Sequence, residues 1–499
     1  MILAIDQGTT GTTVLVLDRQ ARIVSQASAE IPQQYPQPGW VEHRPEDLLQ
    51  VTYQVIRKAL AATRLRARAV TAIGITNQRE TTILWDRRTG RPVAPAIVWQ
   101  CRRTAPLCER LIRQGDRPLV RRATGLVIDA YFSGTKIHWL LDHVPGLRRR
   151  AARGDVAFGT VDTWLIWNLT GGRVHATDYT NASRTMLYNI RSLRWDPRLL
   201  ELLTVPATLL PSVLPSAGSF GITRNSGPLP DGIPITGVAG DQQASLVGQG
   251  CLTPGTAKNT YGTGCFLLLN TGSTCVYSRA GLISTLAYGG SARPVYALEG
   301  SVFIAGAAIQ WLRDELRVIT RADQTAAIAR SVPDTGGVYV VPAFVGLGAP
   351  YWDMGARGAI VGLTRGSNRG VLIRATLESL AYQTRDVVES MIADSGFRLR
   401  ELRVDGGAAR NDWLMQFQAD ILGIPVRRPA HIATTGRGAG LLAGVGIGWW
   451  TTGHLDRLRT GPERVFRPQM TARVRDRRYR GWQEAVARVR TNRRARQNT

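Results

Sequence analysis

Cysteine is scarce in this sequence, and its spacing excludes a disulfide or zinc framework. No two of the five cysteines are separated by only two residues; they are Cys101, Cys108, Cys251, Cys265 and Cys275. An odd number of widely spaced cysteines is typical of reduced thiols, which persist in the cytosol. The six histidines show no metal-ligand spacing. We therefore expect a cytoplasmic protein without structural zinc.

Long hydrophobic runs are also missing. None approaches the ~20 apolar residues of a membrane-spanning helix, and the nearest segment, 438–450, is short and glycine-rich, as in a tightly packed core helix. The chain begins in an apolar strand rather than in a basic region followed by an apolar segment. We therefore expect neither a secretory signal nor a membrane span.

Acidic residues and lysine are both few, which leaves a large positive charge. The chain has 63 Lys and Arg against 37 Asp and Glu, a net charge of +26, and its only lysines are Lys58, Lys136 and Lys258. Such a charge attracts nucleic acids and anionic metabolites. The arginines are scattered and no nucleic-acid-binding motif accompanies them, so we expect no nucleic-acid partner.

The first 18 residues hold the most informative pattern in the chain. An apolar strand at 2–5 runs into Asp6, a turn rich in glycine and threonine follows at 8–13, and a second β-branched run covers 14–17. Glycine lets the backbone approach a ligand, and successive N–H groups can form an anion nest. An Asp at the strand end could hold Mg²⁺ beside a phosphate. The alternative is an ordinary hairpin with glycine in its turn.

The rest of the chain mixes strands and helices, which predicts an α/β fold. Predicted helices span residues 45–64, 159–169, 244–248, 300–316, 370–391, 411–422 and 435–450, with another around 482–489 in the basic tail. Predicted strands span 23–31, 70–75, 83–85, 97–99, 233–238, 257–261, 266–270, 337–341 and 402–404. The glycine–threonine turn at 262–264 repeats the opening hairpin, so we expect two similar halves divided near Gly250; chance similarity is the alternative.

Three glycine turns and two aspartates stand at predicted strand ends. The turns are at 8–11, 262–264 and 406–407, and the aspartates are Asp6 and Asp241. Ligands of open α/β sheets bind at such strand ends, so the turns could cradle a nucleotide whose base or ribose lies near Gly407 and Asn411. Phosphoryl transfer needs positioning, Mg²⁺ and a group that deprotonates the attacking hydroxyl. Asp241 suits that last role, and Asp6 suits Mg²⁺.

Two common kinase patterns are absent from the sequence: it contains neither a P-loop nor the His-Arg-Asp and Asp-Phe-Gly motifs of protein kinases. The chain instead resembles the FGGY family of carbohydrate kinases along nearly its whole length. Matching runs include IDQGTT (5–10), GWVEH (39–43), GITNQRETT (74–82), IVWQCRRT (97–104), AYFSGTK (130–136), GTVDTWLIW (159–167), TDYTNASRTM (177–186), AGDQQA (239–244), AKNTYGTGCF (257–266), IQWLRDE (309–315) and VDGGA (404–408).

The resemblance implies a fold, an activity and a set of ligands. The fold would be two actin-like (ribonuclease H-like) α/β domains, 1–249 and 250–499, flanking a catalytic cleft. The reaction would be ATP-dependent phosphorylation of glycerol to sn-glycerol 3-phosphate, with Mg²⁺ as cofactor. The assembly would be a homodimer or homotetramer.

The resemblance also implies the roles of particular residues. Asp241 would be the catalytic base and, with Asp6, a metal ligand. Glycerol would be bound by Arg79, Glu80, Trp99, Tyr131, Asp241, Gln242 and Phe266. The nucleotide would be contacted by Thr9, Thr10, Gly11, Thr13, Thr263, Gly306, Gln310, Gly407 and Asn411. An Arg–Glu pair can hold two hydroxyls of a polyol in one orientation.

Each of these residues has a plainer explanation when it is taken alone. An Arg–Glu pair after a strand is commonly a surface ion pair. Trp99 and Phe266 could belong to the core, and Asp241 could cap the following helix. Gly306 could serve close helix packing. Only their joint occurrence favours a site.

Three departures from the family pattern lead to further expectations. The family's Ser-Ser-Arg after IDQGTT is here Gly11-Thr12-Thr13, so a phosphate-facing arginine is lost and we expect weaker nucleotide binding or slower turnover. Ala433 replaces a glutamate and Arg437 an apolar residue, which affects either a helix start or the charge near the nucleotide. Asp231-Gly232 replaces Thr-Arg in the loop at 225–232, which predicts loss of inhibition by fructose 1,6-bisphosphate.

Two other functions remain open. Another polyol or ketose kinase of the same family would share most of these motifs. A non-catalytic actin-like nucleotide-binding protein would tolerate the lost phosphate ligand, although Asp241 argues against it.

Overall fold

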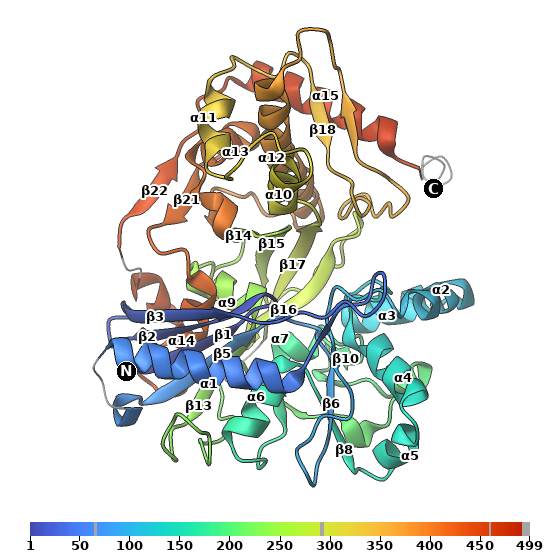
Figure 1. The fold of residues 1–499 in the computed structure, drawn as a ribbon, viewed down its shortest axis with the longest axis vertical. Helices are drawn as coiled ribbons and strands as arrows, with labels where there is room; N and C mark the ends of the chain where they lie inside the picture. The colour runs from blue at the N-terminus through green and yellow to red at the C-terminus, as the bar shows by residue number, and fades with distance from the viewer. Residues whose placement is uncertain (64–66, 290–293, 459–460, 492–499) are drawn as a thin grey trace.

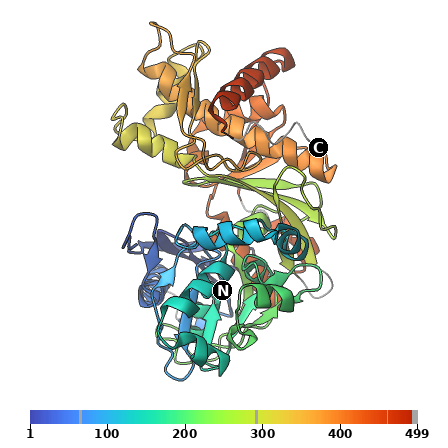
Figure 2. The ribbon, with the colours of Figure 1, turned by 90° about the vertical axis from the view of Figure 1, so that its right-hand side faces the viewer.

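The computed structural model describes residues 1–63, 67–289, 294–458 and 461–491, which form two lobes, each built on one sheet (Figures 1 and 2). The N-terminal sheet has the order β13 (Ile235–Gly240), β5 (Ala72–Asn77), β1 (Ile2–Gln7), β2 (Gly11–Leu17), β3 (Ile23–Glu30). The C-terminal sheet has the order β16 (Ile283–Gly289), β17 (Pro294–Val302), β15 (Cys265–Gly272), β14 (Ala257–Tyr261), β20 (Leu402–Asp405), β21 (Val426–Pro429), β22 (Glu463–Phe466).

The two sheets repeat one topology. The hairpins β1–β2 and β14–β15 are antiparallel, and each first strand pairs in parallel with a later one, β5 or β20. An antiparallel strand, β3 or β17, extends the hairpin, and a parallel strand, β13 or β21, extends the other side. The predicted similarity of the two halves is thereby confirmed, and each glycine–threonine turn occupies the same place in its sheet.

Helices cover both faces of the N-terminal sheet. Helix α1 (Pro45–Ala62) packs on β2 and β3, and α14 (Thr434–Gly446) packs on the opposite face together with α9 (Asp241–Gly248). The approach of α14 is so close that a Cβ on Gly74 would lie 2.2 Å from the carbonyl oxygen of Ala439. The predicted core helix is thus confirmed, although it ends at Gly446. Helix α14 belongs to the second half of the chain but packs on the sheet of the first half. The domain division near Gly250 therefore stays a prediction.

The C-terminal lobe is organised around α12 (Arg369–Ser395), which packs on the second sheet. The other helices of this lobe are α10 (Gly306–Asp314), α11 (Gln324–Arg330), α13 (Asp412–Leu422) and α15 (Ala472–Val489), with strands β18 (Tyr339–Val341) and β19 (Ala359–Val361). The basic tail forms α15, which stacks Trp482 on Tyr382 with ring centroids 5.5 Å apart. The predicted helix at 482–489 therefore begins ten residues earlier than expected, and residues 492–499 lie outside the described part.

Smaller elements complete the N-terminal lobe. They are α2 (Ala105–Gln114), α3 (Arg117–Thr124), α4 (Ser133–His143), α5 (Leu147–Ala152), α6 (Val161–Leu169), α7 (Tyr179–Ala182) and α8 (Pro197–Leu202), with the strand pairs β4 (Glu42–His43) and β7 (Ala96–Ile97), β6 (Ile83–Asp86) and β8 (Val156–Gly159), β9 (Ala176–Asp178) and β12 (Ser212–Leu214), and β10 (Tyr188–Asn189) and β11 (Arg194–Trp195). Strand β16 of the other lobe packs against α7 and so joins the lobes.

Several other sequence-based assignments were wrong in detail. The predicted helix at 300–316 is strand β17 up to Val302, and helix α10 begins only at Gly306. Strand β2 begins at Gly11 rather than at 14, and helix α9 begins at Asp241 rather than at 244.

Within the described residues, no helix is long and apolar enough to cross a bilayer. All five cysteines are free thiols, and four of them are buried.

Candidate active site

Asp241 stands where strand β13 passes into helix α9. The N-cap position of α9 is Gly240, whose N–H donates to the Thr180 hydroxyl over 2.8 Å and anchors the strand end. The Asp241 carboxylate forms an ion pair with Arg79, 3.1 Å from its Nε, and the Asp241 side chain is 28% exposed. The carboxylate is therefore fixed on one side and open on the other, as a group that must reach a substrate requires. Asp241 is the first residue of α9 and not its cap.

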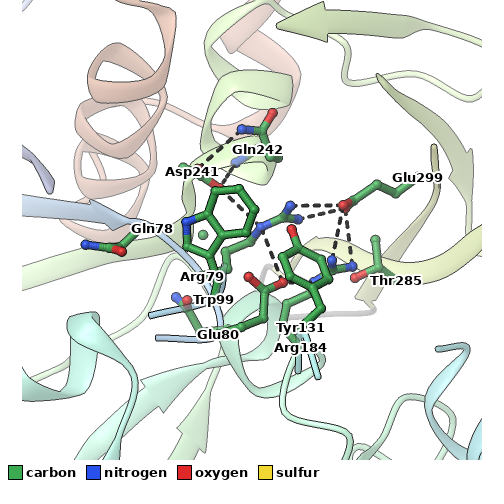
Figure 3. A network of polar contacts seen from close by, with 12 residues as sticks. Gln78, Arg79, Glu80, Trp99, Tyr131, Arg184, Asp241, Gln242, Thr285 and Glu299 are labelled. Atoms are coloured by element: carbon green, nitrogen blue, oxygen red, sulfur yellow. Dashed lines mark hydrogen bonds and ion pairs between the residues drawn. The ribbon is translucent and has the colours of Figure 1, made fainter. Parts of the chain in front are cut away.

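Arg79 and Glu80 follow strand β5 and are buried in a network of four charges (Figure 3). The two terminal nitrogens of Arg79 donate to the Glu299 carboxylate over 2.7 and 2.9 Å. Glu80 accepts the Arg184 Nε–H over 2.6 Å, and Arg184 also donates to Glu299 over 3.1 Å. All four residues are at most 3% exposed. The alternative that Arg79 and Glu80 form a surface ion pair is therefore wrong.

The charges of this network shift the pKa of its carboxylates in opposite directions. Burial alone would raise the pKa of Glu299, but the guanidiniums of Arg184 and Arg79 outweigh burial and lower the pKa to about 2. Burial raises the pKa of Glu80 despite the same two arginines. Glu299 is thus the firmly ionised member of the network.

Three aromatic rings lie beside the charges. Trp99 contacts Tyr131 and Phe266 edge to face, with centroid distances of 5.5 and 6.3 Å. Trp99 and Tyr131 come from the N-terminal lobe and Phe266 from β15 of the other lobe. All three rings are partly exposed, so they are not core residues. Apolar ring faces next to hydrogen-bonding charges suit a small molecule with C–H groups and hydroxyls.

Gln242, the remaining polyol residue of the prediction, is held by a buried lysine. Its side-chain oxygen accepts a short hydrogen bond from Lys258 Nζ, and its Nε2 donates to the Asp241 carboxylate over 3.3 Å. Lys258 also donates to the Thr260 hydroxyl over 2.8 Å, and burial lowers its pKa to about 8. Because Lys258 can only donate, it orients the Gln242 amide.

The residues of the second half that are predicted to contact the nucleotide gather at one pocket. A pocket of about 570 Å³ in the C-terminal lobe is lined by Thr263, Gly306, Gln310, Gly407 and Asn411. Gly306 begins α10 against the 262–264 turn, where a Cβ would lie 2.6 Å from the Gly262 oxygen. The prediction for these five residues is consistent with their shared location. The Asn411 amide, however, is already engaged, because it caps α13 and donates to Thr325 over 3.1 Å.

The residues of the first hairpin that are predicted to contact the nucleotide do not line that pocket. The Thr9 hydroxyl accepts the Trp99 indole N–H over 2.9 Å, which links the hairpin to the polyol residues. Thr13 pairs with Asp6 across the strands, and its hydroxyl lies 2.9 Å from that of Ser28. Thr10 and Gly11 form the end of the hairpin, next to Thr9.

Asp6 lies in the same region as Asp241. Burial, followed by the nearby charges of Asp241 and Asp405, raises the pKa of Asp6 to about 7. In the part of the chain that the structure describes, no three His, Cys, Asp or Glu side chains gather closely enough to chelate a metal by themselves. Mg²⁺ commonly uses one or two carboxylates together with substrate phosphates, so this aspartate pair fits such an ion.

Two residues that depart from the family pattern, Ala433 and Arg437, lie at the start of helix α14. Arg437 donates to the carbonyl oxygen of Gly248 over 2.8 Å and to that of Leu458, so it stabilises the C-terminal end of α9. Helix α14 forms without a side-chain cap at Ala433. Arg437 is therefore a helix-end contact and does not belong to the nucleotide pocket.

Sequence reasoning missed Arg184, Glu299 and Lys258. Arg184 lies inside the matching run at 177–186, but nothing in that run distinguishes it. Glu299 is the one charged residue of strand β17, which is otherwise mostly apolar, and this pattern signals a buried, paired charge. Lys258 lies in the polar strand Ala257–Tyr261, where nothing distinguishes it. For Glu299 alone, therefore, the sequence held a usable signal.

The structure is that of a two-lobed actin-like α/β protein with an open pocket of about 570 Å³ in the C-terminal lobe and a set of polar and aromatic side chains around Asp241. The models of the FGGY family of carbohydrate kinases match this chain, the N-terminal domain over residues 1–248 and the C-terminal domain over 257–447. The chain belongs to the FGGY family of carbohydrate kinases.

Individual relatives agree along the full chain. A glycerol kinase of Desulfitobacterium hafniense is 57% identical over 98% of this chain and 99% of its own length. A glycerol kinase of Halorhodospira halophila is 59% identical over 98% and 96%. The crystal structure of Plasmodium falciparum glycerol kinase with ADP has a TM-score of 0.91 at 36% identity and covers 98% of both chains. A xylulose kinase of Lactobacillus acidophilus, 20% identical over 97% of this chain and 98% of that one, shares the fold with a TM-score of 0.87.

Proposed function

We propose that the protein transfers the terminal phosphoryl group of ATP to glycerol, which gives sn-glycerol 3-phosphate and ADP. The observation that carries the proposal is the partly exposed Asp241 carboxylate paired with buried Arg79, in a charge network that an aromatic wall drawn from both lobes adjoins. The glycerol kinase names of full-length relatives support the same substrate.

In the proposed reaction Asp241 accepts the proton of the attacking hydroxyl. The hydroxyl oxygen bonds to the terminal phosphorus, and the bond from that phosphorus to ADP breaks. Arg79 and Glu80 hold the other hydroxyls, Gln242 orients the chain, and Trp99 with Phe266 covers the carbon atoms. Mg²⁺, when bound, would neutralise phosphate charge, with Asp6 and Asp241 as its protein ligands.

The nucleotide is assigned to the pocket of the C-terminal lobe. Thr263, Gly306, Gln310, Gly407 and Asn411 would surround it, and the first hairpin with Thr9, Thr10, Gly11 and Thr13 would face its phosphates. The ADP complex of the Plasmodium falciparum relative supports an adenine nucleotide.

The test is a coupled assay of ADP release with glycerol and a panel of other polyols and ketoses, including xylulose. We expect glycerol to give the highest kcat/KM and the product to be sn-glycerol 3-phosphate. If a ketose gives a higher kcat/KM than glycerol, the ketose is the substrate. If no compound of the panel stimulates ADP release, the carbohydrate kinase activity is contradicted.

A further inference from the structure

A cluster of four buried charges connects parts of the chain that lie far apart. Arg79 follows β5, Arg184 follows α7, and Glu299 lies on β17 in the sheet of the other lobe. Figure 3 shows the Glu299 carboxylate between the two guanidiniums. Two arginines and two glutamates, with Glu80 as the fourth member, leave the cluster without net charge. Such a cluster stabilises little by itself, because desolvation opposes the attraction.

Arg79 and Glu80, the two predicted polyol residues in the cluster, each pair more closely with a residue far away in the sequence than with each other. Arg79 and Glu80 are consecutive, yet their closest charged atoms are 3.9 Å apart. Arg79 instead uses both terminal nitrogens on Glu299, and Glu80 takes the Nε–H of Arg184 over 2.6 Å. Glu80 also has a φ of 60°, a conformation that a non-glycine residue rarely adopts without support.

This arrangement decides how Arg79 meets the catalytic carboxylate. Both terminal nitrogens of Arg79 are held by Glu299, and one of them also donates to Gln243 Oε1 over 3.1 Å. Arg79 therefore presents only Nε to Asp241, at 3.1 Å. The other oxygen of Asp241 accepts from Gln242 Nε2 over 3.3 Å and keeps a second lone pair for the substrate hydroxyl. If Glu299 released the terminal nitrogens, Asp241 would be a nearby carboxylate able to accept both, since a guanidinium favours two parallel hydrogen bonds.

We propose that Glu299 and Arg184 are positioning residues for the polyol site: they hold Arg79 and Glu80 apart, keep Arg79 from forming a two-bond pair with Asp241, and tie the site to the C-terminal sheet. The inference rests on the proposed function, because it assigns how the substrate residues of that reaction are held. It makes polyol binding depend on a carboxylate that does not itself touch the substrate.

The test is steady-state kinetics of Glu299→Gln, which keeps the shape and removes the charge. A side-chain NH₂ then faces the guanidiniums, so we expect kcat/KM for the polyol to fall about 30-fold or more, with a higher KM for the polyol. The KM for ATP should stay within about twofold, because the nucleotide pocket is untouched. Glu299→Asp keeps the charge with a shorter reach and should recover part of the activity.

The matched control is Glu378→Gln in α12. Glu378 is 1% exposed and pairs with Arg374 and Arg478 over 2.9 and 3.2 Å, away from the polyol residues. It measures the general cost of a buried Glu→Gln change in the same lobe. We expect lower thermal stability and an unchanged KM for the polyol.

The possible outcomes distinguish the positioning role of Glu299 from the proposed function. If Glu299→Gln keeps the wild-type KM for the polyol and its kcat falls no more than that of Glu378→Gln, the positioning role is contradicted. If Glu299→Gln does not accumulate as folded protein, the charge-balanced R184Q/E299Q variant and Glu299→Asp carry the same comparison. If wild type prefers another polyol or ketose, the comparison is made with that substrate, so a wrong substrate counts against the proposed function alone.

Discussion

The proposed polyol end and the proposed nucleotide end of the site differ in how their side chains are held. At the polyol end Arg79 and Glu80 are buried, and each is bound by an opposite charge from a distant segment. At the proposed nucleotide end Thr263 and Gln310 are exposed, and the pocket wall includes Gly262, Gly306 and Gly407. Fixed buried charges discriminate hydroxyl positions strongly, whereas an open pocket binds through many weak contacts. Substitutions at the polyol end should therefore lower kcat/KM more than substitutions at the nucleotide end, and they should change the KM of the polyol and not that of ATP.

The largest effect that would sharpen this comparison is expected for Glu80→Gln. The glutamine oxygen can still accept from Arg184, so the geometry stays while the charge-assisted bond to a substrate hydroxyl is lost. We expect kcat/KM for glycerol to fall about 10- to 100-fold, with little change in the KM for ATP. Equal rises in both KM values, measured under saturating co-substrate, would show that the two ends are not independent.

A smaller effect is expected for Thr13→Arg at the first hairpin. Thr13 lies opposite Asp6, and an arginine there would face the proposed phosphate position. We expect the KM for ATP to fall about tenfold. Ser28→Ala is the control, since it removes the hydroxyl partner of Thr13 without adding charge. No change in ATP affinity would mean that the new side chain points elsewhere.

A smaller effect still is expected for Gln310→Ala in the nucleotide pocket. The side chain is exposed on α10, so its loss removes one weak contact. We expect the KM for ATP to rise only about threefold and the KM for glycerol to stay constant. A loss as large as that of Glu80→Gln would break the comparison, because it would make the nucleotide end equally demanding.

The smallest expected effect is on how the free energy of unfolding depends on pH, through the ion pairs of Glu299 at the polyol end. The pKa of Glu299 is about 2 in the folded protein against an ordinary value of 4.5. Its stabilising contribution is therefore complete above pH 4.5 and is lost as the pH falls toward 2. We expect the difference in urea-unfolding free energy between wild type and Glu299→Gln to be constant from about pH 6 to 8 and to shrink near pH 4. A difference that grows on acidification would contradict the ion pairing.

The sequence predicted the elements of the fold where hydrophobic periodicity is clear. The helix at 45–64 and the hairpins at both glycine–threonine turns are confirmed to within a few residues. The failure at 300–316 has a physical cause. Strand β17 lies between β16 and β15 and is buried on both faces, so it lacks the alternation that marks a strand. The return of α14 to the first sheet has no local signal, because only the tertiary contacts of its glycines show it.

The candidate site was predictable where its residues share a motif. Arg79, Glu80, Trp99, Tyr131, Asp241, Gln242 and Phe266 come together at one site. Arg184 and Glu299 were not found because they act through pairing across 115 residues of chain, which no spacing encodes. The metal roles of Asp6 and Asp241, the oligomeric state, the cytoplasmic location and the lost response to fructose 1,6-bisphosphate stay predictions.

The most direct test of the central claim is the turnover of Asp241→Asn in the coupled ADP-release assay, with and without glycerol. Asparagine keeps the size of the side chain but cannot accept the hydroxyl proton. We predict that kcat falls about 10²- to 10⁴-fold while the KM for ATP changes little. Turnover within about tenfold of wild type would contradict the assignment of Asp241 as the base.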